Sequence, residues 1–145
     1  MTDRRGPPVV PAALDLLHTA RHDLGEAMAT TVPTARYAAA HLAALRTAAA
    51  VLAVRTRPCA TKRPRNVWAL LPQVAPELTE WAAFFAAGAG KRAAAEAGLT
   101  RAVLPREADD LLRDAQTFLA LVETTLGLTH QPAIPHVAPV AHRAS

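Results

Sequence analysis

Prolines divide this sequence into long stretches that contain none. Four of them each stand just before such a stretch, at Pro11, Pro33, Pro76 and Pro105. A proline fits the first turn of a helix, where its missing N–H costs no hydrogen bond, and it breaks a helix interior. The spacing therefore predicts one helix in each stretch, over residues 11–30, 33–56, 76–97 and 105–127, with a short extra turn near 66–71.

The composition favours helices over strands. Hydrophobic residues make up 51% of the chain but aromatic residues only 4%, because alanine supplies much of the apolar content. Alanine has the highest helix propensity, and no stretch alternates apolar and polar residues with a period of two. Helices of similar length joined by short connections pack as antiparallel neighbours. We predict an all-α fold, an up-down four-helix bundle over residues 11–128.

The two ends of the chain differ from the predicted bundle. Residues 1–10 and 129–145 are rich in proline and in small or polar residues, and neither has an apolar stripe at the helical period. Such segments cannot bury enough apolar surface to offset the entropy of ordering them. We therefore predict a disordered N-terminal tail and a disordered C-terminal tail rich in proline and histidine.

The third predicted helix carries an aromatic cluster and two glycines. Trp81, Phe84 and Phe85 stand at positions i, i+3 and i+4, so we predict that they anchor the core. Gly88 and Gly90 lie in the stretch GAGKR, which lacks the first glycine, the final Ser/Thr and the preceding strand of a phosphate-binding loop. We interpret these glycines as a bend or a close approach between helices.

Cysteine content and hydropathy indicate the compartment. Cys59 is the only cysteine, so no internal disulfide can form and a reducing environment is expected. The first ten residues contain no apolar core of a secretory signal, and no uninterrupted apolar run approaches the length that spans a bilayer. We expect a soluble cytoplasmic protein without a membrane partner.

Three stretches together resemble a known family. They are PTARYAAAHLAALRTAAAVLAVRTRP, NVWALLPQVAPELTEWAAFFAAGAGKRAAAEAGL and PREADDLLRDAQTFLALVETTLGL. The chain from Pro11 to Leu128 resembles the HEPN proteins (higher eukaryotes and prokaryotes nucleotide-binding), in their small bacterial single-domain type. The resemblance implies a helical bundle, frequent homodimerisation and a link to RNA or nucleotides, with no cofactor. Some members are metal-independent ribonucleases of toxin–antitoxin and defence systems, and others have no catalytic residues.

The resemblance makes Arg36 and His41 candidate catalytic residues. Catalytic members carry an arginine that holds the scissile phosphate and, four to six residues later, a histidine that assists attack by the ribose 2′-hydroxyl. Arg36 and His41 have this spacing, although they lie early in the domain and Tyr37 follows the arginine. With six histidines and many arginines in the chain, chance alone gives about one such pair.

Helix geometry separates the two candidate side chains. Five residues turn a helix through about 500°, which leaves Arg36 and His41 roughly 140° apart. We predict that His41 lies on the buried face with Tyr37 and that Arg36 points away from it. A catalytic site would then need an irregular helix start or a second subunit, and this alternative stays open.

A second candidate site is a basic segment after the second predicted helix. Residues 1–65 contain ten Lys or Arg and four Asp or Glu, although the net charge of the whole chain is only +4. The segment RTRPCATKRPR could neutralise phosphates without sequence preference, or it could be a solvated loop. Its candidate nucleic-acid-binding residues are Arg55, Arg57, Lys62, Arg63 and Arg65.

No metal site is predicted. His18, His22 and Glu26 are spaced four apart, which can place ligands on one side of a helix, but they continue an ordinary polar face. No cysteine or second histidine pair obviously completes a site. We expect neither a metal nor a cofactor.

These observations leave three functional hypotheses. The first is a dimerising HEPN-like module that engages RNA, a nucleotide or a protein partner without assured catalysis. The second is a ribonuclease that uses Arg36 and His41 across a dimer, and the third is a structural adaptor that does not contact nucleic acid. Small side chains on the second predicted helix would allow close self-association, at Ala38, Ala49 and Ala53.

Overall fold

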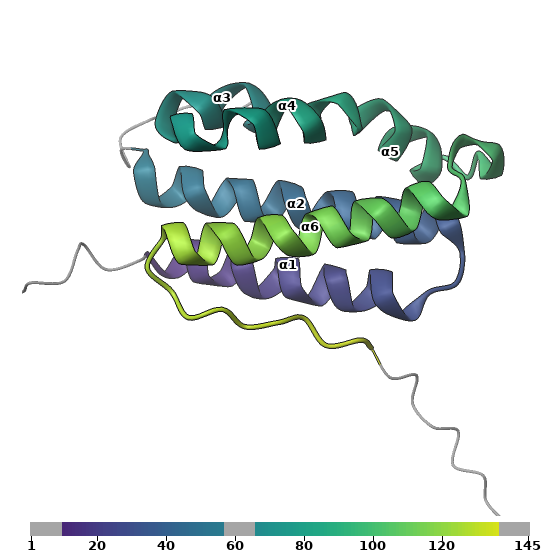
Figure 1. Cartoon of the computed structure of the whole chain (residues 1–145), viewed down its shortest axis with the longest axis horizontal. Helices are drawn as coiled ribbons and strands as arrows, with labels where there is room; N and C mark the ends of the chain where they lie inside the picture. Colours follow the sequence, from purple (N-terminus) through teal and green to yellow (C-terminus); the bar gives the residue numbers. More distant parts are fainter. Residues whose placement is uncertain (1–9, 57–65, 137–145) are drawn as a thin grey trace, which may run out of the picture.

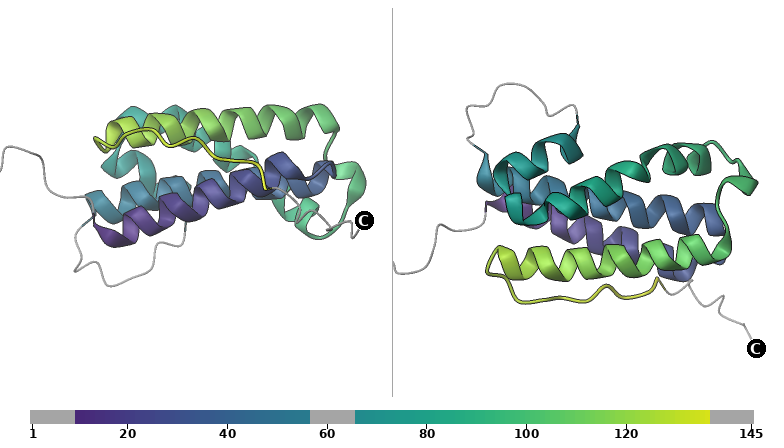
Figure 2. Two further views of the ribbon diagram at one scale, coloured as in Figure 1. Left: turned by 90° about the horizontal axis from the view of Figure 1, so that it is seen from below. Right: turned by 45° about the horizontal axis from the view of Figure 1, so that its top comes forward.

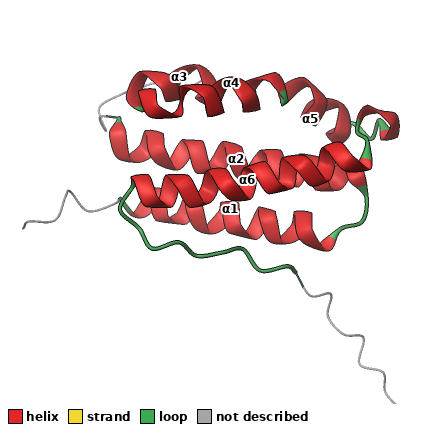
Figure 3. Ribbon diagram, viewed as in Figure 1, coloured by secondary structure: helices red, strands yellow, loops and turns green. Residues whose placement is uncertain are grey.

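The described part of the chain is helical throughout its core. The computed structural model describes residues 10–56 and 66–136, and no strand occurs among them. Figure 1 shows the order of the helices, and Figure 3 shows how little of the described chain lies in loops. The elements are α1 (Pro11–Ala29), α2 (Pro33–Arg55), α3 (Val67–Val74), η1 (Pro76–Leu78), α4 (Thr79–Ala87), α5 (Ala89–Glu96), η2 (Thr100–Ala102) and α6 (Pro105–Thr125).

The helices form an up-down bundle around α2. The chain runs along α1, returns along α2, advances again through α3, α4 and α5, and returns along α6 (Figures 1 and 2). α2 packs against α1, α3, α5 and α6, so it is the central helix. Alanines with no exposed surface let neighbouring backbones come close to it, as at Ala40, Ala44 and Ala48. The predicted all-α bundle is therefore confirmed.

Most of the predicted helix bounds agree with the structure because the prolines mark them. Pro11, Pro33 and Pro105 each occupy the first turn of α1, α2 and α6. The extra turn predicted near 66–71 is a longer helix, α3, which continues through Pro72. Its N-terminus is capped by Asn66, whose side-chain oxygen accepts hydrogen bonds from the backbone N–H groups of Trp68 and Ala69.

The single helix predicted over 76–97 was wrong in one respect. The structure divides this stretch into η1, α4 and α5, with Gly88 between α4 and α5. A Cβ atom on Gly88 would stand 2.8 Å from the phenolic oxygen of Tyr37 on α2, so the glycine permits a close approach there. Gly90 has open space around it and serves no such purpose. The interpretation of the glycines is thus confirmed for Gly88 alone.

Aromatic side chains fill the space between α4 and α6. The ring of Phe118 on α6 lies 5.2 Å from that of Phe85 and 5.4 Å from that of Trp81, both on α4. Trp68 of α3 stacks on Phe85 at 5.2 Å. The prediction that Phe84 also anchors the core was wrong, because 47% of its surface is exposed.

α2 has the length and apolar composition of a membrane span. It is the one helix of residues 10–56 and 66–136 that meets this criterion, whereas the sequence was expected to contain no such segment. Within the bundle, 56% of the window is buried. Contacts with α1, α3, α5 and α6 therefore account for its apolar character without a bilayer.

The C-terminal tail departs from the predicted disorder over its first part. After α6, Gly127 turns the chain with a positive φ of 76°, and residues 128–136, here called the strap, run back in extended form along α1 and α6 (Figure 2). The backbone N–H of His136 donates to the carbonyl of Gly25 on α1 at 3.1 Å. The tail prediction is wrong for the strap, while residues 1–9 and 137–145 lie outside the described part.

Candidate functional site

His41 is enclosed in the core of one chain. Its exposed fraction is 1%, and its ring lies about 6 Å from the rings of Tyr37, Trp68 and Phe85. Its Nε2 atom is 2.8 Å from the carbonyl oxygen of Phe85. A carbonyl can only accept, so Nε2 carries the proton and Nδ1 is the unprotonated nitrogen.

The electrostatic state of His41 follows from this enclosure. Burial lowers the pKa of His41 below its usual 6.5, and the hydrogen bond to the Phe85 carbonyl opposes this only in part. Nδ1 is buried and has no hydrogen-bond partner among the described residues. The imidazole is therefore neutral near pH 7 and is shut off from any substrate within its own chain.

Arg36 is held at the C-terminal end of α1. Its Nε donates to the carbonyl of Ala27 at 2.9 Å, and its Nη2 donates to the carbonyl of Thr30 at 2.7 Å. Its Nη1 is paired with Asp109 of α6. A guanidinium is well suited to these carbonyls, which have no partner within the helix and lie at the negative end of its dipole. Arg36 thus joins the end of α1 to α6.

The structure does not bring Arg36 and His41 together. Arg36 lines a shallow hollow of about 310 Å³ with Met28, Asp109 and Gln116, whereas His41 faces α3 and α4. The two side chains lie on different sides of α2, as the helical winding predicted. Within one chain, the pair does not form a phosphate-cleaving site.

Only one of the candidate nucleic-acid-binding residues lies in the described part of the chain. Arg55, at the end of α2, donates from Nη1 to Glu77 at 2.8 Å and to the carbonyl of Val74 at 3.1 Å. This arginine ties α2 to the end of α3. Arg57, Lys62, Arg63 and Arg65 lie outside the described residues.

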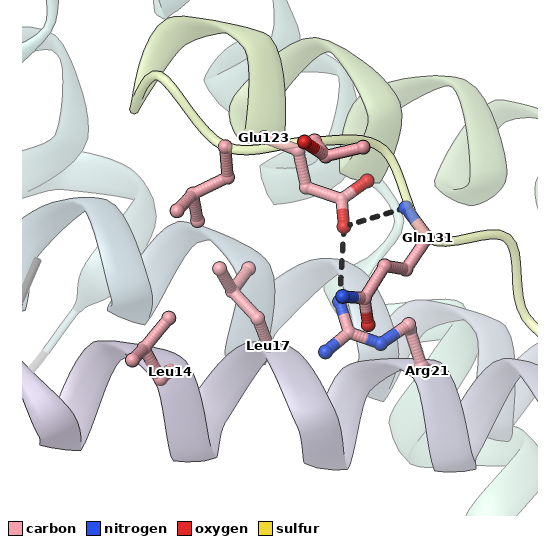
Figure 4. A pocket seen from close by; sticks show the side chains of 7 residues that line it. Leu14, Leu17, Arg21, Glu123 and Gln131 are labelled. Carbon is pink, nitrogen blue, oxygen red and sulfur yellow. Dashed lines mark hydrogen bonds and ion pairs between the residues drawn. The ribbon is translucent and has the colours of Figure 1, made fainter.

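A buried carboxylate that the sequence analysis missed lies near the turn into the strap. Glu123 on α6 has an exposed fraction of 1%, and its Oε2 accepts from Nη1 of Arg21 at 2.9 Å and from the backbone N–H of Gln131 at 3.2 Å (Figure 4). Nδ1 of His130 lies 2.5 Å from Oε1. A signal for it existed, because Glu123 follows the core residue Leu119 by four and so falls on the buried face of α6.

A small pocket adjoins this carboxylate. It has a volume of about 200 Å³, and Leu14, Leu17 and Leu128 form its apolar side (Figure 4). Its polar floor is the Arg21–Glu123 pair, in which every charge already has a partner. A carboxylate held by three donors does not act as a free base, so we assign this cluster the structural role of holding the strap.

The other candidate features also have structural roles. Ala38, Ala49 and Ala53 are half-buried, and Ala38 and Ala53 pack against the core of their own chain, so these alanines do not form the free surface that was expected. His22 packs against His136 of the strap, with ring centres 4.4 Å apart. Among residues 10–56 and 66–136, no three His, Cys, Asp or Glu side chains are placed to hold a metal ion.

Comparisons with known proteins agree with this architecture. The geometry defines a class first, an all-α up-down bundle with a central alanine-rich helix. A family model described as HEPN_SAV_6107-like HEPN matches residues 27–123, which is well over half of the chain. The chain therefore belongs to the HEPN family. Neither a curated protein nor a solved structure matches it.

Proposed function

We propose that this HEPN protein is a dimerising cytoplasmic module that binds RNA, a nucleotide or a protein partner, and that it is not a ribonuclease acting through Arg36 and His41. The observation that supports the non-catalytic role is the enclosure of His41, with an exposed fraction of 1%. A general base must reach the proton that it removes, directly or through one water. His41 instead spends its only N–H on the Phe85 carbonyl.

The surroundings of Arg36 support the same proposal. A phosphate-holding arginine presents two parallel N–H groups to the anion. Arg36 directs Nε and Nη2 to backbone carbonyls of α1, and its remaining terminal nitrogen meets Asp109. A phosphate would have to displace a carboxylate and open the end of a helix. We therefore assign Arg36 a role in positioning α1 against α6.

The test of this part is RNA cleavage by the purified chain and by His41→Gln. A glutamine amide can still donate to the Phe85 carbonyl, so this variant keeps the buried hydrogen bond while it removes the imidazole. We expect no cleavage by the wild type above that by His41→Gln across single-stranded and structured RNAs. Cleavage that is present in the wild type and lost in an equally folded His41→Gln would make the ribonuclease hypothesis correct, with the site completed by a second subunit.

The binding role has support in the charge of the first half of the chain. Residues 1–65 carry a net charge of +6, and Lys62 and Arg63 are adjacent in the basic segment. Phosphate neutralisation by such residues gives binding that weakens steeply as salt rises. We expect salt-dependent binding of single-stranded RNA that is not sequence-specific.

A charge-matched pair of variants tests the binding role. Lys62→Gln/Arg63→Gln removes two positive charges from the basic segment, and Arg101→Gln/Arg106→Gln removes two from exposed positions on the other half of the chain. We expect the first variant alone to weaken RNA binding at two salt concentrations and to reduce the salt slope by about two. An equal effect of both variants would show only a response to net charge, and no binding at either salt would favour the structural adaptor.

A further inference from the structure

A hollow between α4 and α6 combines exposed aromatic rings with carboxylates. It has a volume of about 350 Å³ and is lined by Glu80, Trp81, Phe84 and Asp114. Trp81 is half-buried, because it packs against Phe118, whereas 47% of Phe84 is exposed. Its two aromatic side chains therefore offer apolar surface that the chain itself does not cover.

The carboxylates of this hollow differ from their neighbours on the same helices. Glu77 is paired with Arg55, and Asp110 is paired with Arg113. Glu80 and Asp114 accept no hydrogen bond and form no ion pair within residues 10–56 and 66–136. Partial burial and the charge of Asp110 raise the pKa of Asp114 above its usual value, which shows that the folded chain leaves this carboxylate poorly compensated.

The lining selects a cation that has an apolar stem. The faces of Trp81 and Phe84 attract a guanidinium or ammonium group through their π electrons, and the carboxylates can pair with it. A neutral apolar ligand would desolvate both acids without compensation, and a phosphate would be repelled. Arginine fits best, because its planar guanidinium both stacks on rings and pairs with two carboxylate oxygens.

The same side of α6 offers a second contact. Leu121 follows Asp114 by seven residues, so it lies two turns further along the same face, and 37% of its surface is exposed. Large apolar side chains left exposed on a surface near charged groups are typical of protein interfaces. A ligand that places an apolar side chain close to its arginine would cover both parts of this face.

We propose that the hollow lined by Glu80, Trp81, Phe84 and Asp114 binds an arginine side chain of a protein partner, presented in a short segment that alternates arginine and leucine. The guanidinium stacks on the two rings and pairs with the two carboxylates, and a neighbouring leucine covers Leu121. This inference rests on the proposed binding role and names one class of partner for it. It does not involve RNA, because the carboxylates repel phosphates.

The test is a nuclear magnetic resonance titration of the full chain with an acetylated, amidated Arg-Leu-Arg-Leu peptide. The chain has two tryptophans, Trp81 in the hollow and Trp68 in the core, so their indole N–H signals serve as probe and internal control. We expect the Trp81 signal to shift and the Trp68 signal to stay. A peptide with citrulline in place of arginine keeps the shape without the charge and should bind at least tenfold more weakly.

Two variants of equal charge separate the hollow from its surroundings. Glu80→Gln/Asp114→Asn should weaken peptide binding about tenfold, whereas Glu77→Gln/Asp110→Asn should leave it within about twofold, because those acids are already paired. Equal binding of the citrulline peptide, or equal loss in both variants, would overturn the proposal. Loss of self-association in Glu80→Gln/Asp114→Asn would also overturn it, since a second copy would then occupy the hollow.

The outcome is independent of the ribonuclease test. RNA cleavage dependent on His41 would overturn the non-catalytic role and leave the peptide result intact. Absence of peptide binding would overturn this inference and leave RNA binding through the basic segment intact.

Discussion

The imidazole of His41 couples the stability of the fold to pH. Burial lowers the pKa of His41 in the folded chain below 6.5, so the unfolded chain takes up this proton first as the pH falls. The contribution of His41 to stability is therefore fully present above about pH 6.5 and decreases as the pH falls toward the folded-state pKa. The slope can reach about 1.4 kcal/mol per pH unit.

Urea unfolding of the wild type and of His41→Gln between pH 7.5 and 5 measures this effect. We expect the free energy of unfolding of the wild type to fall more steeply than that of the variant below pH 6.5. The other histidines are common to both proteins, so their contributions cancel in the comparison. Parallel curves would show that His41 is accessible to protons in the folded state.

Gly25 is the residue at which α1 admits the strap. A Cβ atom there would lie 2.5 Å from the carbonyl oxygen of Ile134 and 2.7 Å from the ring of His136. Gly25→Ala should therefore displace the strap and speed hydrogen exchange at residues 130–136. Gly90→Ala is the matched control, because it meets no atom within 4 Å and should instead stabilise α5 by about 0.5–1 kcal/mol. Equal exchange of the strap in both variants would contradict this account.

At the scale of these residues, sequence reasoning succeeded where the partners are local. The burial of His41 could be predicted because its helix alone fixes which neighbours share its face. The role of Arg36 could not, since Asp109 is 73 residues away and the carbonyls that it binds belong to another helix. The exposure of Phe84 was missed for the same reason, because α4 rotates to place Phe85 and Trp81 against Phe118.

Among the elements, α1, α6 and the strap meet at one buried ion pair. Arg21→Met would leave the Glu123 carboxylate buried with a charge that His130 and Gln131 only partly compensate. Breaking a buried pair in this way costs about 3–5 kcal/mol. We expect Arg21→Met/Glu123→Leu to recover most of that loss, because neither charge then remains in the core. Thermal or urea unfolding of both variants checks this expectation, with Arg101→Met as an exposed control.

A double variant no more stable than Arg21→Met would mean that the charge of Glu123 is not what the single variant exposes. The sequence marked the starts of α1, α2 and α6 through their prolines, and nothing comparable marked the division at Gly88. That division depends on the contact with Tyr37 across the bundle. The strap was missed because it has no periodic pattern, and its order comes from a few specific hydrogen bonds.

The whole molecule is predicted to form a homodimer. Family membership favours this state, and the core alanines of α2 are already used within one chain, so we expect the interface on other surfaces. Light scattering coupled to size exclusion should give a mass of about twice 15.3 kDa at micromolar concentration. The variant Glu80→Gln/Asp114→Asn should have the same mass. A single-chain mass for the wild type would remove the dimer and, with it, any site completed by a second subunit.

The strap has a consequence for how this chain is produced and trimmed. The matched family region ends at residue 123, but Glu123 receives two of its three partners from His130 and Gln131. During synthesis, the last helix therefore emerges from the ribosome before the groups that neutralise it, and the bundle becomes complete only when residue 136 has followed. A fragment cut at the family boundary would lack these groups permanently, with an acid in its interior held by one arginine.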